Sequence, residues 1–160
     1  MHWLPRVVVL ILLSSFVSRF DNSIESTLFI VKPDATSRSL QSVIYMMLES
    51  RLGIRMEREL TVSEASLETL HAHYHEHRNR SFFPDLIRFM RSGTLAVSIW
   101  SGPEGTVEAV RSLVGSTDPQ FAGEGTIRKL FGQSKQMNTV HASDSVASAN
   151  REIRIWFGTP

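Results

Sequence analysis

The feature that most constrains this chain is the order in which strand-type and helix-type segments alternate along it. Four short runs rich in β-branched and apolar residues are typical of strands, at residues 27–32, 54–62, 94–100 and 138–141. Apolar residues recur at helical spacing in residues 40–48, 67–74, 86–90, 107–114 and 146–157. Two split βαβ units with a last helix are typical of an α+β, ferredoxin-like βαββαβ fold. We therefore expect a four-stranded antiparallel sheet with helices packed on one face.

A few residues set the expected boundaries of these elements. Gly53 is expected to stop the first helix, and Ser63 is the expected N-cap of the second. Ser143 or Asp144 is expected to cap the last helix. Residues 115–125 form a long loop with one proline and three glycines. A loop of that length in a compact domain is usually functional or mobile.

The chain has 160 residues and no cysteine, which indicates one compact domain without disulfides, thiolate metal sites or thiol catalysis. No internal repeat is present, so we assign residues 27–157 to a single domain. Arg6 and Arg19 are the only charged side chains among residues 1–20, and without them the body has one fewer Lys+Arg than its 16 Asp+Glu. A nearly neutral body argues against binding nucleic acid through bulk charge.

Residues 1–20 have the pattern of a targeting leader. Residues 7–13 are uninterrupted aliphatics preceded by Arg6, as in a secretory signal. The run is shorter than the roughly 20 apolar residues of a membrane span, so no stable span is expected. A mitochondrial presequence is the rival interpretation, because the stretch has arginines and serines but no acidic residue. A buried strand or a misassigned start codon is the third. Residues 21–26 are expected to form a polar linker.

Four histidines alternate along the second expected helix, at His71, His73, His75 and His77. On a helix they would form two i, i+4 pairs on different faces, and each pair could ligate zinc or nickel. The spacing implies no third ligand. The interpretation that we favour is a solvated, histidine-rich helix end without a metal.

His141 is placed differently, at the end of the last expected strand and just before a helix start. The N-terminus of that helix would favour an anion beside the imidazole. A neutral imidazole needs no base to act as a nucleophile, because its ordinary pKa is about 6.5. If a carboxylate accepts from one ring nitrogen, the other is free to attack. A structural or capping role for this histidine is the alternative.

Three cationic residues are candidates for a clamp on polyphosphate, namely Lys32, Arg111 and Arg128. Phosphoryl transfer depends largely on positioning and charge neutralisation, which such a clamp would supply. Each could instead be a solvated charge. Phe82 is either a core anchor or a platform on which a base stacks. The sequence has no G-x-x-x-x-G-K-[ST] loop and no G-x-G-x-x-G fingerprint.

Several segments, taken in order, resemble the nucleoside diphosphate kinase family. The segment around His141 is similar to the active-site signature of that family, and the others are similar to its first strand, its nucleotide-binding helical hairpin and its loops. The matching segments are residues 28–34 (LFIVKPD), 73–74 (HY), 81–84 (SFFP), 115–119 (GSTDP), 125–128 (GTIR), 138–146 (NTVHASDSV) and 152–157. The resemblance covers essentially the whole of residues 27–157.

The resemblance implies a ping-pong exchange of the γ-phosphate between nucleoside triphosphates, such as ATP, and nucleoside diphosphates. His141 would be the nucleophile and become a phosphohistidine, with Ser143 and Glu152 orienting its imidazole. Mg2+ would be carried by the nucleotide phosphates and not by protein ligands. The residues implied to bind the nucleotide are Lys32, Tyr74, Phe82, Arg111, Thr117, Arg128 and Asn138.

Within that set the resemblance implies distinct roles. Lys32 would act in catalysis as well as binding, and would lie with Asn138 near the sugar. Phe82 would lie against the base, and Tyr74 would support Lys32. Arg111, Thr117 and Arg128 would hold the phosphates together with Lys32.

The resemblance also implies a homo-oligomer. The chain departs from the family at Lys129-Leu130, where Gly-Asp usually stands. Its sequence at Asn138-Thr139 is similar to that of the more divergent animal members. Two other functions are the alternatives: a kinase-fold interaction protein with weak or lost catalysis, and a metal-binding module at residues 71–77. An interaction protein has no physical reason to keep His141 together with all its cationic partners.

Overall fold

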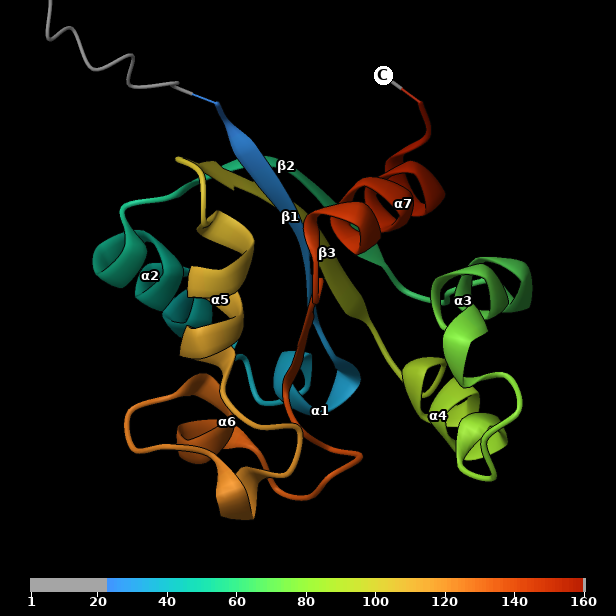
Figure 1. Ribbon diagram of the computed structural model, residues 1–160. Coiled ribbons are helices and arrows are strands. Elements are labelled where there is room, and N and C mark those ends of the chain that lie inside the picture. The colour runs from blue at the N-terminus through green and yellow to red at the C-terminus, as the bar shows by residue number, and fades with distance from the viewer. Residues whose placement is uncertain (1–22, 160) are drawn as a thin grey trace, which may run out of the picture.

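The computed structural model describes residues 23–159, which contain a four-stranded sheet. Its strands are β1 (Glu25–Val31), β2 (Arg55–Val62), β3 (Leu95–Gly102) and β4 (Val140–Ala142). They lie in the order β2-β3-β1-β4, and every neighbouring pair is antiparallel (Figure 1). The predicted α+β fold with a four-stranded antiparallel sheet is confirmed.

Helices lie between these strands and after the last of them. They are α1 (Pro33–Thr36), α2 (Gln41–Leu52), α3 (Leu67–His73), α4 (Phe83–Met90), α5 (Thr106–Val114), α6 (Ile127–Phe131) and α7 (Val146–Phe157). Two short 3-10 helices, η1 (His75–His77) and η2 (Pro119–Phe121), lie in the connections. Gly53 ends α2 as predicted, with a φ of +65° that glycine adopts without a Cβ clash.

The composition of β1 explains why both faces of the sheet are covered. Leu28, Phe29, Ile30 and Val31 are all fully buried. Successive side chains of a strand point to opposite faces, so an unbroken apolar run needs apolar partners on both. α2 and α5 pack on one face, and α3, α4 and α7 on the other (Figure 1). The prediction of helices on a single face is therefore wrong.

Each face has its own apolar cluster. On the first, Trp100 of β3 is fully buried and meets the ring of Tyr45 of α2 edge-on, with 5.2 Å between centroids. On the second, Leu70 of α3 and Met90 of α4 pack against β1 and β3. This second cluster fixes α3, α4 and α7 against β1 and β3.

β1 starts two residues earlier than expected. Glu25 and Ser26, which we assigned to the linker 21–26, pair with the end of β3. The Glu25 carboxylate also accepts hydrogen bonds from the backbone N–H groups of Gly105 at 3.1 Å and Val107 at 2.6 Å. These bonds satisfy donors at the start of α5 that the helix itself leaves unpaired. Glu25, which the sequence placed in a linker, therefore joins β1 to the start of α5.

Two helix caps lie at serines other than those expected. Ser66, not Ser63, caps α3, and its Oγ accepts a hydrogen bond of 3.0 Å from the N–H three residues on. Ser145, not Ser143 or Asp144, caps α7 in the same way at 3.1 Å. Several residues with capping side chains stand close together in both regions, so the sequence alone does not single out the cap.

The predicted leader, residues 1–20, lies outside the described residues. Among the helices of residues 23–159, none combines the length and the apolar character needed to cross a membrane.

Candidate active site

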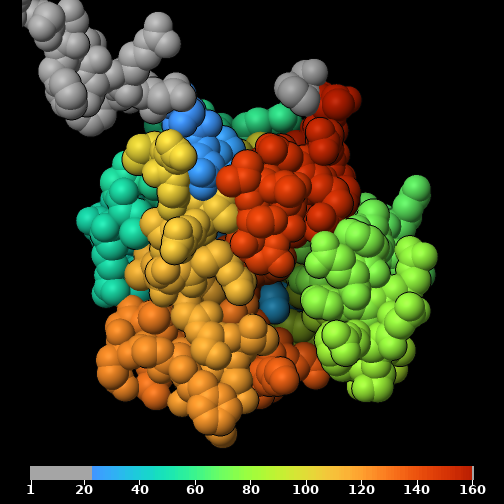
Figure 2. All heavy atoms as spheres, viewed as in Figure 1, coloured from blue at the N-terminus to red at the C-terminus, as the bar shows by residue number. Residues whose placement is uncertain are grey.

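A hollow of about 680 Å³ lies between α4, α7 and the chain that leads into β4 (Figure 2). It is lined by all the residues that the sequence implied for nucleotide binding, together with the implied nucleophile: Lys32, Tyr74, Phe82, Arg111, Thr117, Arg128, Asn138 and His141. Ser143 and Glu152 lie behind His141, hydrogen-bonded to each other at 2.7 Å. Further polar lining comes from His77, Arg80, Asp85, Lys135, Gln136 and Asp144.

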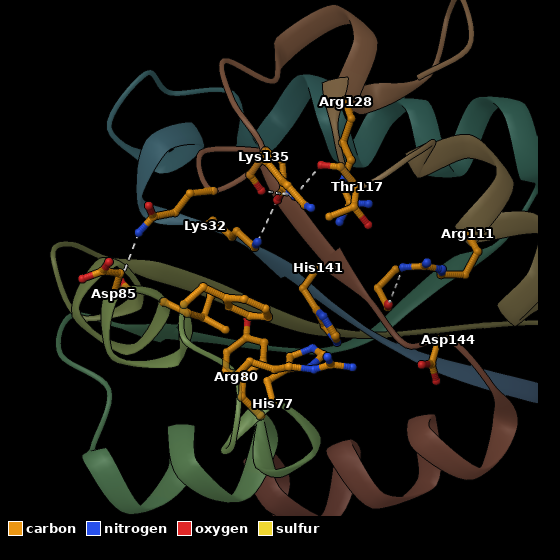
Figure 3. A pocket seen from close by; sticks show the side chains of 16 residues that line it. Lys32, His77, Arg80, Asp85, Arg111, Thr117, Arg128, Lys135, His141 and Asp144 are labelled. Carbon is orange, nitrogen blue, oxygen red and sulfur yellow. Dashed lines mark hydrogen bonds between the residues drawn. The ribbon is translucent and has the colours of Figure 1, made fainter. Parts of the chain in front are cut away.

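His141 lies in the middle of β4, the short strand at one edge of the sheet. β4 pairs with β1 so that His141 stands opposite Ile30. The His141 side chain is 19% exposed and lies near the centre of the pocket, between Lys32 and Arg111 in the view of Figure 3. Pairing with a central strand fixes the backbone that carries this imidazole.

Glu152 of α7 orients the imidazole. Its Oε2 lies 2.9 Å from His141 Nε2 and also accepts the hydrogen bond from Ser143 Oγ. Ser143 Oγ in turn accepts the N–H of Leu28 at 3.2 Å, which ties the group to β1. An ionised carboxylate can only accept, so the proton of the neutral ring lies on Nε2. His141 Nδ1 then keeps its lone pair and is the nitrogen free to react.

The surroundings of His141 favour the neutral ring. Burial lowers the pKa of His141 well below its usual value, and the charges of Lys32, Arg128 and Arg111 lower it further. Burial also raises the pKa of Glu152. Because the lone pair of a neutral imidazole is the nucleophile, the lowered pKa keeps the reactive form populated at neutral pH.

Arg128 lies on the five-residue helix α6, and two backbone carbonyls from other segments hold its guanidinium. The sequence did not predict α6, because so short a helix shows no periodicity. Its Nη1 donates to the Gly115 carbonyl and its Nη2 to the Val140 carbonyl, both at 3.0 Å. Gly115 has a φ of +85°, and a Cβ there would lie 2.6 Å from Thr126 Oγ1. Only glycine fits this close approach. Burial lowers the pKa of Arg128 to about 10, so the guanidinium stays charged at neutral pH.

Lys32 follows the end of β1 and is 6% exposed. Its Nζ donates to Asn138 Oδ1 at 2.7 Å. Asn138 Nδ2 donates to the carbonyls of Thr117 at 2.9 Å and Lys135 at 3.0 Å, so this amide joins the lysine to two loops. Burial and, to a smaller extent, the charge of Arg128 lower the pKa of Lys32 to about 7. An anion in the pocket would favour the charged form of this lysine.

Aromatic side chains form part of the pocket wall. Phe82, at the start of α4, is 49% exposed, and its ring centroid lies 5.6 Å from that of His77. Tyr74 is 7% exposed, and its hydroxyl has no hydrogen-bond partner among the described residues. The expected support of Lys32 by Tyr74 is therefore not a hydrogen bond. The Tyr74 ring instead stands edge-on to His141, with 6.1 Å between centroids.

The alternating histidines do not form the expected helix end. α3 stops at His73 and the chain turns into η1, so neither i, i+4 pair lies on one helix. His73 is 3% exposed, and its ring centroid is 4.5 Å from that of His141. Trp156 Nε1 donates to His73 Nδ1 at 3.1 Å. The interpretation of a wholly solvated cluster is wrong for His73, which belongs to the site.

Among the described residues, His73, His141 and Glu152 have ligand atoms close enough to suit a metal ion, within 4.8 Å of one another. Two of these groups already bond each other, and His73 Nδ1 already accepts from Trp156. Lys32 also places positive charge near His141, which opposes a second cation. We assign the cluster to the orientation of the imidazole.

The sequence predicted no role in the site for His73 or Asp34, although both lie in segments that resemble the family. His73 is one of four alternating histidines, and it is buried at the end of α3 whereas the other three are exposed. Asp34 follows Pro33 in the first turn of α1, and its Oδ2 accepts the N–H of Thr139 at 3.0 Å. The two residues of that bond are 105 positions apart, and no local pattern announces such a contact.

Comparison with known proteins finds relatives over most of the chain. A family model described as nucleoside diphosphate kinase matches residues 25–160. The nucleoside diphosphate kinase of Synechococcus sp. (strain JA-3-3Ab) is 43% identical over 133 residues, which cover 83% of this chain and 87% of that protein. Nucleoside diphosphate kinase 3 of Mus musculus is 39% identical over 151 residues, which cover 94% of this chain and 88% of that protein.

A solved structure agrees with these relatives. The nucleoside diphosphate kinase of Halobacterium salinarum in complex with CDP superposes with a TM-score of 0.80 and 34% identity, covering 86% of this chain and 90% of that one. Fold and relatives define the class of protein as a phosphotransferase. Within that class, the chain belongs to the nucleoside diphosphate kinase family. Nothing in these comparisons supports the alternative of an interaction protein without catalysis.

Proposed function

We propose that this chain moves the γ-phosphate of a nucleoside triphosphate to a nucleoside diphosphate through a phosphohistidine at His141. The observation that carries the proposal is the 2.9 Å contact between His141 Nε2 and Glu152 Oε2. It assigns the ring proton to Nε2 and leaves the Nδ1 lone pair of a neutral imidazole in a pocket lined by Lys32, Arg111 and Arg128.

In the first half-reaction, the Nδ1 lone pair forms a bond to the γ-phosphorus while the bond from that phosphorus to the β–γ bridging oxygen breaks. The electron pair of the broken bond stays on the leaving diphosphate. Lys32, Arg111 and Arg128 offset the charge on the phosphate oxygens. The Nε2 proton remains shared with Glu152, which stabilises the positive charge that the ring gains. No proton has to leave His141.

In the second half-reaction, a terminal oxygen of the acceptor diphosphate attacks the phosphorus of the phosphohistidine. The N–P bond breaks, its electron pair returns to Nδ1, and the neutral imidazole is restored. The same cations serve both halves, because donor and acceptor differ by one phosphate. A single pocket therefore supports a ping-pong sequence without two nucleotide sites.

The pocket suits nucleotides with different bases. Stacking on an exposed ring such as that of Phe82 tolerates every base, since each has a flat apolar face. The relative from Halobacterium salinarum was solved with the pyrimidine nucleotide CDP. We therefore propose both purine and pyrimidine diphosphates as acceptors.

Mg2+ fits this pocket as a companion of the nucleotide. The ion binds oxygen ligands, and in phosphotransferases it usually takes substrate phosphates, one or two carboxylates and waters. Asp85 and Asp144 are the carboxylate residues among those that line the pocket. The phosphates would supply most of the oxygens, and Asp144, three residues after His141, is a candidate carboxylate ligand. Mg2+ would neutralise charge on the β- and γ-phosphates.

Transfer of label tests the proposal. The chain is incubated with ATP labelled at the γ-phosphate, freed of nucleotide, and then mixed with unlabelled GDP. We expect label to move from protein to GTP, because the enzyme holds the phosphoryl group between the two nucleotides. The His141→Ala variant should take up no label. Replacement of the exposed His71 by alanine is the matched control and should leave transfer unchanged.

We also propose that the chain forms a homo-oligomer. β2 lies at the edge of the sheet and, within residues 23–159, pairs only with β3. Seven of its eight residues are exposed in the single chain, among them Met56 at 39% and Leu60 at 37%. An uncovered edge strand with apolar side chains is a natural place for a second strand to pair.

For the N-terminal segment we propose a secretory leader, with a mitochondrial presequence as the alternative. The support is the aliphatic run at residues 7–13 behind Arg6. N-terminal sequencing of the native protein separates the two from an uncleaved chain. A mature terminus near residue 20 in protein from the culture medium supports the proposal, and an intact Met1 contradicts it.

A further inference from the structure

The turn that leads into His141 has an unusual backbone. Thr139 has a φ of +79°. Across it, the N–H of Val140 donates to the carbonyl of Asn138 at 2.9 Å. A three-residue turn with this bond and a positive central φ is the rare, strained form of the γ-turn. A β-branched residue seldom adopts such a φ, so the surrounding contacts must offset its cost.

The γ-turn joins the two halves of the active site. Asn138, before the turn, accepts the hydrogen bond from Lys32 Nζ at 2.7 Å. Val140, after the turn, accepts from Arg128 Nη2 at 3.0 Å and begins the strand that carries His141. The angle of the turn therefore sets where the nucleophile lies relative to both cations.

Asp34 is the side chain that holds the turn. Its Oδ2 accepts the N–H of Thr139 at 3.0 Å, and the Thr139 carbonyl accepts the N–H of Lys32 at 2.9 Å. The Asp34 side chain is 3% exposed, and Thr139 is fully buried. The strained residue is thus fixed at both its N–H and its carbonyl by the segment that follows β1.

Burying the charged carboxylate of Asp34 to accept the Thr139 N–H costs free energy. Burial raises its pKa, and the charges of Lys32 and Arg38 counteract that effect. Arg38 Nη2 lies 3.5 Å from Asp34 Oδ2, and Asp34 Oδ1 has no hydrogen-bond partner among the described residues. A neutral acceptor would satisfy one N–H without burying a charge. An ionised carboxylate is, however, a stronger acceptor for the Thr139 N–H than a neutral group.

Asp34 does not border the catalytic pocket. It lines a separate hollow with Arg38 and Met137. We propose, building on phosphoryl transfer through His141, that Asp34 is a positioning residue. Its carboxylate holds the strained γ-turn at Thr139 and thereby places His141 relative to Lys32 and Arg128.

Three variants test this role: Asp34→Ala, Thr139→Gly and the double variant. The readout is the rate at which γ-labelled ATP labels His141 in a single turnover at saturating ATP, below the melting temperature of each protein. Asp34→Ala should slow labelling about 10–100-fold, the scale expected when a reacting group is misplaced by about 1 Å. Thr139→Gly removes the strain and a buried hydroxyl that has no partner among the described residues, and should retain the rate.

The double variant is decisive, because glycine adopts a φ of +79° without help from a carboxylate. We expect it to recover most of the rate that Asp34→Ala loses. Glu25→Ala is the matched control, since Glu25 also accepts backbone N–H groups but lies at the opposite end of β1. It should leave the rate unchanged even where it lowers the melting temperature.

Three results would overturn the proposal. In the first, His141 in Asp34→Ala is labelled at the unaltered rate. In the second, the double variant folds but is labelled as slowly as Asp34→Ala. In the third, both variants fail to fold, which would mean that Asp34 serves the fold alone. If Asp34→Ala alone fails to fold, recovery of folding and rate in the double variant supports the proposal. Label persisting in His141→Ala would instead contradict the proposed function itself.

Discussion

At the scale of single residues, the chemistry depends on which nitrogen of His141 carries the proton. The Glu152 carboxylate settles this by accepting from Nε2 at 2.9 Å. An amide in its place could donate to Nε2 through its NH2 group and force the proton onto Nδ1, the nitrogen that must attack. The Glu152→Gln variant should therefore label His141 about 100-fold more slowly, as misplaced catalytic groups do.

The matched control for this variant is Glu104→Gln, since Glu104 is exposed and lies outside the pocket. Single-turnover labelling with γ-labelled ATP should show an unchanged rate for it. An unchanged rate in Glu152→Gln would mean that the carboxylate does not set the tautomer.

The lowered pKa of Lys32 leads us to expect that nucleotide binding depends on pH. Burial lowers its pKa to about 7 in the free protein, and bound phosphates favour the charged form. Above pH 7, ADP binding should thus take up a proton, and the Kd should rise towards about tenfold per pH unit. Titration calorimetry in two buffers of different ionisation enthalpy measures both effects. Lys32→Met should abolish them, and Lys129→Met, outside the pocket, should not.

The same lowered pKa affects folding with a definite sign. The unfolded chain holds the Lys32 proton up to its ordinary pKa of 10.5, whereas the folded chain loses it near 7. The unfolded chain thus binds more protons at Lys32 than the folded chain between these pH values. The contribution of Lys32 to the free energy of unfolding should therefore increase as the pH rises from about 7 to about 10.5. A Kd for ADP that does not change from pH 7 to 9 would contradict the lowered pKa.

At the scale of elements, periodicity predicted the strands and most helices, because apolar spacing follows directly from burial. It could not predict α6, which has only five residues, or the helices on both faces of the sheet. In the site, local motifs predicted His141 and the cations that the fold brings together in one pocket. Contacts between distant segments, such as Asp34 with Thr139 and Trp156 with His73, leave no local pattern and could not be predicted.

The N-cap of α3 can be tested at this scale by comparing Ser66, the observed cap, with Ser63, the expected one. Ser66 accepts the N–H of Thr69 at 3.0 Å, whereas no side-chain hydrogen bond of Ser63 is found among the described residues. Ser66→Ala should lower the free energy of unfolding by about 1 kcal/mol, the usual worth of an N-cap. Ser63→Ala should change it by less than about 0.5 kcal/mol. Urea unfolding of both variants measures the difference, and equal losses would contradict the assignment.

At the scale of the whole molecule, charge is distributed so that a nearly neutral body binds a strongly anionic substrate. The affinity must come from a few converging side chains, because the body has no excess of basic residues. Lys32, Arg111 and Arg128 come from the end of β1, from α5 and from α6, and the fold gathers them around His141. The net charge of the chain therefore says little about its ligand.

The proposed assembly belongs to this scale as well. The chain has a mass of 18.1 kDa, and light scattering should give a multiple of that of the processed chain. Leu60→Lys, on the exposed edge strand β2, should shift the mass towards the monomer, whereas Leu67→Lys, on the exposed part of α3, should not. A monomer at every concentration of the unaltered chain would contradict the homo-oligomer.

The central claim is that His141 carries the phosphoryl group between two nucleotides. The most direct measurement is the chemical stability and position of the label after incubation with γ-labelled ATP. We predict a phosphoprotein that is labile in acid and stable in base, with the label in the peptide that contains His141, and no label in His141→Ala. A label stable in acid, or one retained by His141→Ala, would contradict the claim.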